Sequence, residues 1–180
     1  MKTELVYKIA DTEEEFEQIH RLNHDTFAEE IRQHHKSPDG HLVDKFHTEN
    51  TYFICMKKGV LIGMIAARSK RPFSLDAKLD NLDSYLPPFE NPCEIRLLAL
   101  QKGSRGGVVL GRLLSLLTSF CQREKYDILL ISGILRQLSL YKHIGFVPFG
   151  PEVGTPEAKY QPMYLRPNAL LVENFLKLKQ

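Results

Sequence analysis

A loop rich in arginine and glycine joins two regular elements near the middle of the chain. The residues Arg105, Gly106 and Gly107 follow an apolar run at 93–100 and begin an amphipathic run at 107–124, which predicts a strand, a short loop and a helix. Free backbone N–H groups at a helix start, together with the helix dipole, favour a bound anion. The spacing therefore indicates a phosphate-binding loop.

A second candidate group lies in the strand that precedes this loop. Glu94 and Arg96 are two residues apart, so their side chains share one face of the predicted strand. A buried carboxylate can accept a proton as a general base, but pairing with Arg96 would stabilise its charged form and weaken it in that role. A catalytic base and a structural ion pair therefore both remain open for Glu94.

Histidines and cysteines are present without the spacing of a metal site. His34 and His35 are adjacent in a polar loop, and the cysteines Cys55, Cys93 and Cys121 are far apart. No metal is expected, and the three cysteines are expected to pack as small apolar side chains. His20 and His24 lie four residues apart on a predicted helix, where packing or solvent exposure is favoured.

The composition is that of an ordinary globular protein. The chain has 180 residues, of which 43% are hydrophobic and 26% charged, and it is expected to form one domain over 1–180. A net charge of +2 is too small to indicate a nucleic-acid partner. No apolar run is long enough for a signal peptide or a membrane span, so a cytoplasmic location is expected.

Periodicity and turn residues predict an α/β order of elements. Thr12 and Glu15 form a possible capping box, and Gly145 is well placed to end a short helix. The segment 69–92 is rich in proline and aspartate and is expected to be a long surface connection with one helical turn. Strands are expected at 6–10, 51–56, 60–68, 93–100, 127–132, 146–150 and 160–165, and helices at 12–31, 107–124, 134–144 and 168–179.

This order and these motifs resemble the Gcn5-related N-acetyltransferase (GNAT) superfamily over about residues 51–165. The resemblance implies a mixed, mostly antiparallel central sheet flanked by helices. It also implies a transferase that moves an acyl group from a coenzyme A thioester, acetyl-CoA or a longer acyl-CoA, to a small-molecule amine acceptor. The first helix often borders the acceptor site in that fold, so acceptor contact is the alternative for His20 and His24.

The resemblance also assigns roles to residues. Tyr141, in the run Leu-Tyr-Lys-His-Ile-Gly-Phe, takes the position of a general acid near the acceptor thiol, with packing between helix and sheet as its alternative. Glu94 becomes the candidate base for the amine. The positions implied in cofactor binding are Leu98, Ala99 and Leu100 for pantetheine, and Arg105, Gly106, Gly107 and Val108 for the pyrophosphate. The family pattern has small residues where this chain has Val108 and Leu110.

A narrower similarity points to acyl-homoserine-lactone (autoinducer) synthases and N-acyl amino acid synthases, which take long acyl chains, often from acyl carrier protein. The usual tryptophan is absent, and their Glu-x-x-Arg motif fails because position 97 is Leu. In that alternative, the apolar residues of 69–92 line an acyl tunnel; otherwise they pack on the core.

A non-catalytic acyl-CoA-binding module is a further alternative. Val172 and Phe175 on the last predicted helix could support a homodimer. The similarity to the autoinducer and N-acyl amino acid synthases rests on Arg21, Phe27, Asp44, Lys45, Phe46, Tyr52, Gly59, Ile62, Gly63, Arg68 and Glu94.

Overall fold

The computed structural model describes residues 4–167 of the chain. The helix predicted at 168–179, with its proposed dimer contacts Val172 and Phe175, lies outside the described residues. In the described part, no helix is both long and apolar enough to cross a bilayer.

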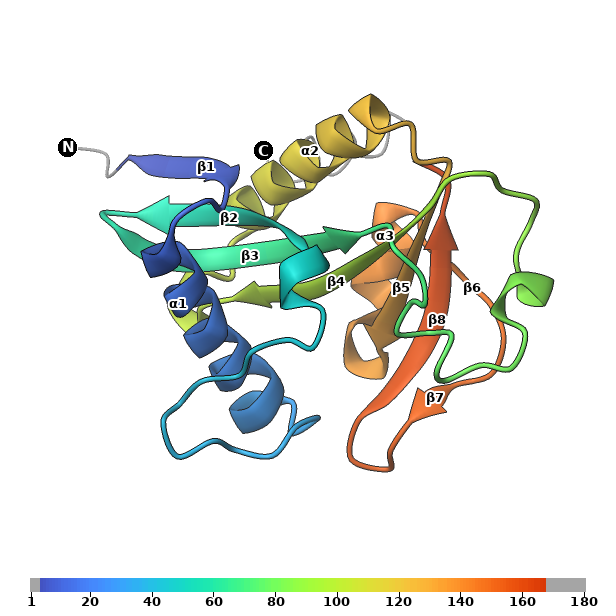
Figure 1. Cartoon of the computed structure of the whole chain (residues 1–180), viewed down its shortest axis with the longest axis horizontal. Helices are drawn as coiled ribbons and strands as arrows, with labels where there is room; N and C mark the ends of the chain where they lie inside the picture. The colour runs from blue at the N-terminus through green and yellow to red at the C-terminus, as the bar shows by residue number, and fades with distance from the viewer. Residues whose placement is uncertain (1–3, 168–180) are drawn as a thin grey trace. The chain divides into compact units, whose positions relative to one another are not determined.

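The strands form a mixed, mostly antiparallel sheet, which confirms the predicted fold class (Figure 1). The strand order is β1-β2-β3-β4-β5-β8-β6, and β7 pairs with β8. The pairs β1–β2, β5–β8, β6–β8 and β7–β8 are antiparallel, whereas β4 and β5 are parallel. The strands are β1 Leu5–Ile9, β2 Thr51–Lys57, β3 Val60–Arg68, β4 Pro92–Leu100, β5 Ile128–Ile134, β6 Val147–Pro148, β7 Val153–Gly154 and β8 Lys159–Leu165.

The helices accompany this sheet in the predicted order. They are α1 Glu13–Asn23, α2 Gly107–Arg123 and α3 Leu138–Ile144, with a π-helix at His24–Glu30 and 3-10 turns at His47–Glu49, Leu82–Tyr85, Lys102–Ser104 and Leu135–Gln137. The strand predicted at 146–150 is shorter than expected, because only two of its residues pair with β8.

The chain divides into two compact units. The first holds the residues up to Ala66 together with Leu97–Leu117, and the second holds Ala67–Arg96 together with the residues from Thr118 onward. Each of the two units therefore contains part of β4.

In the first unit, the start of α1 forms as its sequence predicts. Thr12 accepts a hydrogen bond from the backbone N of Glu15, whose side chain accepts from the backbone N of Thr12, and this completes the capping box. Ile19 and Leu22 are buried in a core with residues of β2, β3 and β4. The single helix predicted over 12–31 is wrong in its second half, where the backbone widens into the π-helix and the N–H of Ile31 reaches back five residues to Thr26.

The hairpin of β2 and β3 also follows from local sequence. Lys58 and Gly59 both have positive φ, of 52° and 76°, as a two-residue type I′ turn requires. Gln18 of α1 holds this hairpin, because its side chain donates to the Gly59 carbonyl (3.1 Å) and accepts from the Leu61 N–H (2.8 Å).

In the second unit, the segment 69–92 is a largely exposed connection with one helical turn, at Leu82–Tyr85, as its composition predicts, but it is anchored by buried apolar side chains. Its apolar side chains are buried against β5 and Phe149, because β5 presents apolar residues that need cover. Arg71 fixes the fold of the segment through ion pairs with Asp76 (3.1 Å) and Asp83. The structure therefore favours the packed loop over the tunnel lining for these buried residues, which are Phe73, Leu75, Leu79 and Leu82.

Candidate active site

An irregularity in β4 marks the candidate site. Leu97 has a φ of 54°, a left-handed conformation that is uncommon for a leucine and costs on the order of 1 to 3 kcal/mol. The ladder between β4 and β5 covers three residue pairs and ends at Glu94, opposite Leu130. The residues predicted to bind pantetheine, Leu98, Ala99 and Leu100, follow directly after the irregular residue, and Ala99 is buried while the two leucines are half-buried.

Within the first unit, Gly63 of β3 sets how closely the end of β4 and the start of α2 approach. A Cβ atom at Gly63 would lie 2.6 Å from Leu100 Cδ2 and 3.2 Å from Val109 Cγ1, so only glycine fits without a shift. The N–H of Gln101 also donates to the Ile62 carbonyl (3.0 Å). This packing places the predicted phosphate loop directly beyond the end of β4.

The predicted order of strand, short loop and helix is present around Arg105. A 3-10 turn at Lys102–Ser104 leads through Arg105 and Gly106 to the first residue of α2, Gly107. No atom of the described residues lies within 4 Å of a Cβ built on Gly106, and its φ is not positive, so the fold itself does not demand glycine there. The Arg105 guanidinium donates from Nε to the Leu100 carbonyl (3.3 Å) and from Nη2 to the Glu30 carboxylate.

The two departures from the family pattern differ in their surroundings. Val108, in the first turn of α2, is 64% exposed, so no core packing requires its bulk. Leu110 is buried and belongs to the core face of the same helix. The departure at 110 therefore serves packing, whereas Val108 adds apolar surface next to the free N–H groups at the helix start.

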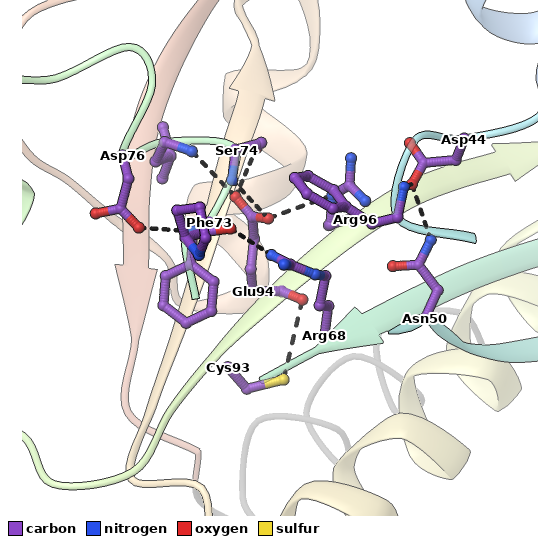
Figure 2. A network of polar contacts seen from close by, with 12 residues as sticks. Asp44, Asn50, Arg68, Phe73, Ser74, Asp76, Cys93, Glu94 and Arg96 are labelled. Atoms are coloured by element: carbon purple, nitrogen blue, oxygen red, sulfur yellow. Dashed lines mark hydrogen bonds and ion pairs between the residues drawn. The ribbon is translucent and has the colours of Figure 1, made fainter. Parts of the chain in front are cut away.

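Glu94 is the centre of a buried polar network in the second unit, drawn in Figure 2. Its Oε1 accepts from Ser74 Oγ (2.6 Å) and from the Leu75 N–H (3.3 Å). Its Oε2 accepts from the Ser74 N–H (3.0 Å) and pairs with Arg96 Nε (3.3 Å). The residue is 1% exposed.

Four donors therefore surround this carboxylate, two on each oxygen. These contacts engage both oxygens of the carboxylate in holding the neighbouring chain and Arg96. Of the two interpretations left open by the sequence, the geometry favours the structural ion pair of Glu94 and Arg96. The nearby Arg68 Nη1 donates to the Pro72 carbonyl (2.5 Å), so the two arginines and Glu94 together hold the chain at 72–75 against β3 and β4 (Figure 2).

Tyr141 lies on the other face of the second unit's sheet. Its ring packs on Gly133 of β5, where an added Cβ would come within 2.8 Å of Cδ2. Glu94 is registered with Leu130, three positions before Gly133, so the two side chains approach the sheet from opposite faces. The sequence did not reveal this separation.

The hydroxyl of Tyr141 donates to Gln137 Oε1 (3.2 Å), one turn earlier. Burial raises the pKa of Tyr141 to about 12, against a smaller opposing effect of Arg136. The phenol therefore stays protonated at neutral pH and is available as a hydrogen-bond donor.

Two polar residues stand out on α1: Asn23, which the sequence analysis did not select, and His20, for which it left acceptor contact as an alternative. Asn23 is 1% exposed, and neither its amide oxygen nor its amide nitrogen has a hydrogen-bond partner. His20 Nδ1, one turn earlier on the same face, is also buried without a partner. Buried polar atoms are almost always satisfied, so these atoms indicate a bound water or a ligand group. The sequence signal that could have identified both residues as buried was their position in the apolar stripe of Phe16, Ile19 and Phe27.

A hydrogen-bonded chain lies beside His20 in the first unit. Asn50 Nδ2 donates to Asp44 Oδ1 (3.0 Å) and to the Tyr52 hydroxyl (3.0 Å), and that hydroxyl lies 3.2 Å from His47 Nδ1. The Tyr52 hydroxyl therefore lies within hydrogen-bond distance of both Asn50 and His47. The His47 ring meets the His20 ring edge-on, with centroids 4.6 Å apart.

The remaining histidines do not form a metal centre. His24 is buried and accepts from the Ser37 N–H (3.0 Å), which is a structural role and fits the packing expected from the sequence. His34 and His35 are exposed. Among residues 4–167, no group of three or more potential ligands could hold a metal ion.

The amino-acid sequence matches no family model and no curated protein. Solved structures resemble the chain closely in fold, although sequence identity is low. The CoA-dependent acyl-homoserine lactone synthase BjaI, with SAM and isopentyl-CoA, has a TM-score of 0.76 and 19% identity, over 91% of this chain and 81% of that chain.

Two further solved structures also resemble the chain in fold at low sequence identity. The acyl-homoserine lactone synthase LasI has a TM-score of 0.78 and 14% identity, over 97% of this chain and 96% of its own. The N-acyl amino acid synthase FeeM, from uncultured soil microbes, has a TM-score of 0.71 and 16% identity, over 92% of each chain. The fold is therefore GNAT-like and is shared with these synthases.

Proposed function

We propose that the chain is an N-acyltransferase that moves an acyl group from an acyl-CoA thioester to a small-molecule amine. The observation that carries the proposal is the left-handed Leu97 in β4, followed within ten residues by an arginine–glycine loop and the start of α2. We further propose that the two compact units act as one acyltransferase domain.

In the proposed donor site, the backbone of Leu98, Ala99 and Leu100 binds the pantetheine arm. The loop from Arg105 to Val108 then meets the pyrophosphate, with free N–H groups at the start of α2 as donors. Glycine at 106 has no packing reason in the protein itself, which supports close approach of a ligand at this position.

Tyr141 is proposed to assist the departure of the thiol. An ordinary thiol has a pKa of about 8.5, so a phenol with a pKa of about 12 holds its proton more tightly than the departing thiolate would. Tyr141 therefore acts by donating a hydrogen bond to the developing negative charge on sulfur, rather than by complete proton transfer in advance.

Glu94 is proposed to act through the structure. Its carboxylate accepts from four donors and so holds residues 74–75 and Arg96 in place. The proton of the amine then leaves to water or to another group. On the acceptor side, the unsatisfied atoms of His20 and Asn23 support a contact between α1 and the polar group of the amine.

The test is release of free thiol from acyl-CoA donors of two to sixteen carbons, measured with a panel of amino acids and alkylamines. We expect turnover with at least one amine, and Tyr141→Phe is expected to lower kcat about tenfold or more with KM for the donor unchanged. Tyr126→Phe is the control, because it removes another half-buried phenol hydroxyl from the same unit. Absence of turnover with every pair would refute the proposal and leave the non-catalytic acyl-CoA-binding module.

A second candidate is an N-acyl amino acid or acyl-homoserine-lactone-type synthase that takes a long acyl chain from acyl carrier protein. The observation that favours it is the similarity to BjaI, LasI and FeeM over more than nine-tenths of the chain. The same assay separates the two candidates. A rate that rises steeply with chain length, or that needs the carrier protein, would favour the synthase.

A further inference from the structure

Arg105, the only arginine of the proposed phosphate loop, is already bound to an acidic side chain. Its Nη2 donates to the carboxylate of Glu30, the last residue of the π-helix. The pair joins residues 75 positions apart in the chain. The Glu30 side chain is 21% exposed and that of Arg105 45%, so the contact is partly shielded from water.

A carboxylate on this guanidinium occupies the place that a phosphate oxygen would take. Arginine binds carboxylate and phosphate with the same planar set of N–H donors. A phosphate group that approaches Arg105 must therefore displace Glu30 or share the guanidinium with it. In both cases the negative charge of Glu30 opposes the negative charge of the phosphate.

We propose that Glu30 is a specificity-determining residue that lowers the affinity of the donor site for the phosphate groups of free coenzyme A. The inference rests on the proposed function, because it takes the Arg105 loop as the pyrophosphate site. Glu30 acts as an internal anion: it holds Arg105 in the absence of ligand, and it leaves recognition of the uncharged pantetheine arm unaffected.

The neighbouring Glu29 provides a matched control. It also lies in the π-helix, and it pairs with Lys36 rather than with Arg105. Glu29→Gln removes the same formal charge one residue away, so it reports the general effect of charge on an anionic ligand. The difference between the two variants reports what is specific to the position of Glu30 beside Arg105.

The experiment is isothermal titration of the full chain with coenzyme A and, separately, with pantetheine, which carries no phosphate. Glu30→Gln is expected to lower the Kd for coenzyme A roughly three- to fivefold relative to Glu29→Gln. The Kd for pantetheine is expected to stay the same in both variants. Glu30→Ala is a second variant that removes the remaining hydrogen-bond acceptor and should show the same direction.

Each outcome decides the inference. Tighter binding of coenzyme A by the Glu30 variants supports it, including the case in which only those variants bind measurably. Equal affinities in the Glu30 and Glu29 variants, or weaker binding by both Glu30 variants, would overturn it and leave the proposed donor site standing. If wild type and all variants fail to bind coenzyme A, the inference and the proposed donor site both fail.

Discussion

Replacement of Glu94 by glutamine separates a structural carboxylate from a catalytic one. Each oxygen of Glu94 accepts from two donors, and the residue is 1% exposed. Whichever way the amide is turned, its NH₂ group replaces an oxygen with two donors. With the NH₂ group at the Oε2 position, the Ser74 N–H and Arg96 Nε lose their acceptor, at about 1 to 3 kcal/mol each. At the Oε1 position the Ser74 hydroxyl can turn and accept, so the Leu75 N–H alone loses its acceptor.

The amide can take the less costly orientation, which leaves one donor without an acceptor and removes the negative charge beside Arg96, so the expected loss in the free energy of unfolding for Glu94→Gln is about 2 kcal/mol or more. For a chain of this size, that loss lowers the melting temperature by roughly 4 to 8 °C. Thermal unfolding followed by far-UV circular dichroism measures the shift, and urea unfolding gives the free energy. Glu90→Gln is the control, because it makes the same change four residues earlier on an exposed side chain.

A melting temperature of Glu94→Gln within about 2 °C of the Glu90→Gln control would refute this reasoning. If kcat nevertheless falls and the acidic limb of the pH–rate profile disappears, the general-base interpretation is restored. A large loss of stability, with turnover retained at low temperature, would support the structural role.

Three further predictions concern other parts of the fold. Gly133→Ala should push the Tyr141 ring from its place, because the new Cβ lies 2.8 Å from Cδ2, and should lower kcat about as much as Tyr141→Phe without weakening coenzyme A binding in titration. Burial alone would raise the pKa of Asp127, but two backbone N–H donors outweigh it and the pKa lies below its usual value. Asp127→Ala should therefore cost about 1 to 2 kcal/mol at pH 7, and urea unfolding should show this difference shrinking as the pH falls below about 4. Burial, and after it repulsion from His47, lowers the pKa of His20 below 6.5, so NMR titration should show a low pKa that rises in His47→Ala. Because the folded state then binds fewer protons than the unfolded state, His20 should contribute stability that is lost as the pH falls from 6.5 through the lower pKa. A His20 pKa at or above 6.5 would contradict the burial argument.

Local rules predicted most of the secondary structure. The capping box at Thr12, the turn at Lys58 and Gly59, and the left-handed Gly145 at the end of α3 involve contacts within a few residues, so the sequence contains their whole cause. The ion pair between Glu94 and Arg96 could also be predicted from the sequence, because strand alternation alone places both side chains on one face.

The segment 69–92 shows what composition leaves open. Its prolines and aspartates predicted a surface connection, and most of its residues are exposed, but they did not predict that Phe73 and Leu75 are at most 1% exposed. They are buried because β5 needs an apolar cover on that face, and a requirement of one element cannot be read from the composition of another. The π-helix after Asn23 was missed for a similar reason, since a change of helix type leaves little trace in side-chain periodicity.

The sequence by itself determined the order of elements, the arginine–glycine loop between a strand and a helix, and the resemblance to the GNAT superfamily, because these depend on patterns within short windows. Only the tertiary structure decided the left-handed Leu97, the four donors of Glu94, the placement of Tyr141 on the opposite face, and the pairing of Arg105 with Glu30. These features depend on contacts between residues up to 75 positions apart or on backbone geometry imposed by packing, and residue types alone do not specify which distant groups will meet.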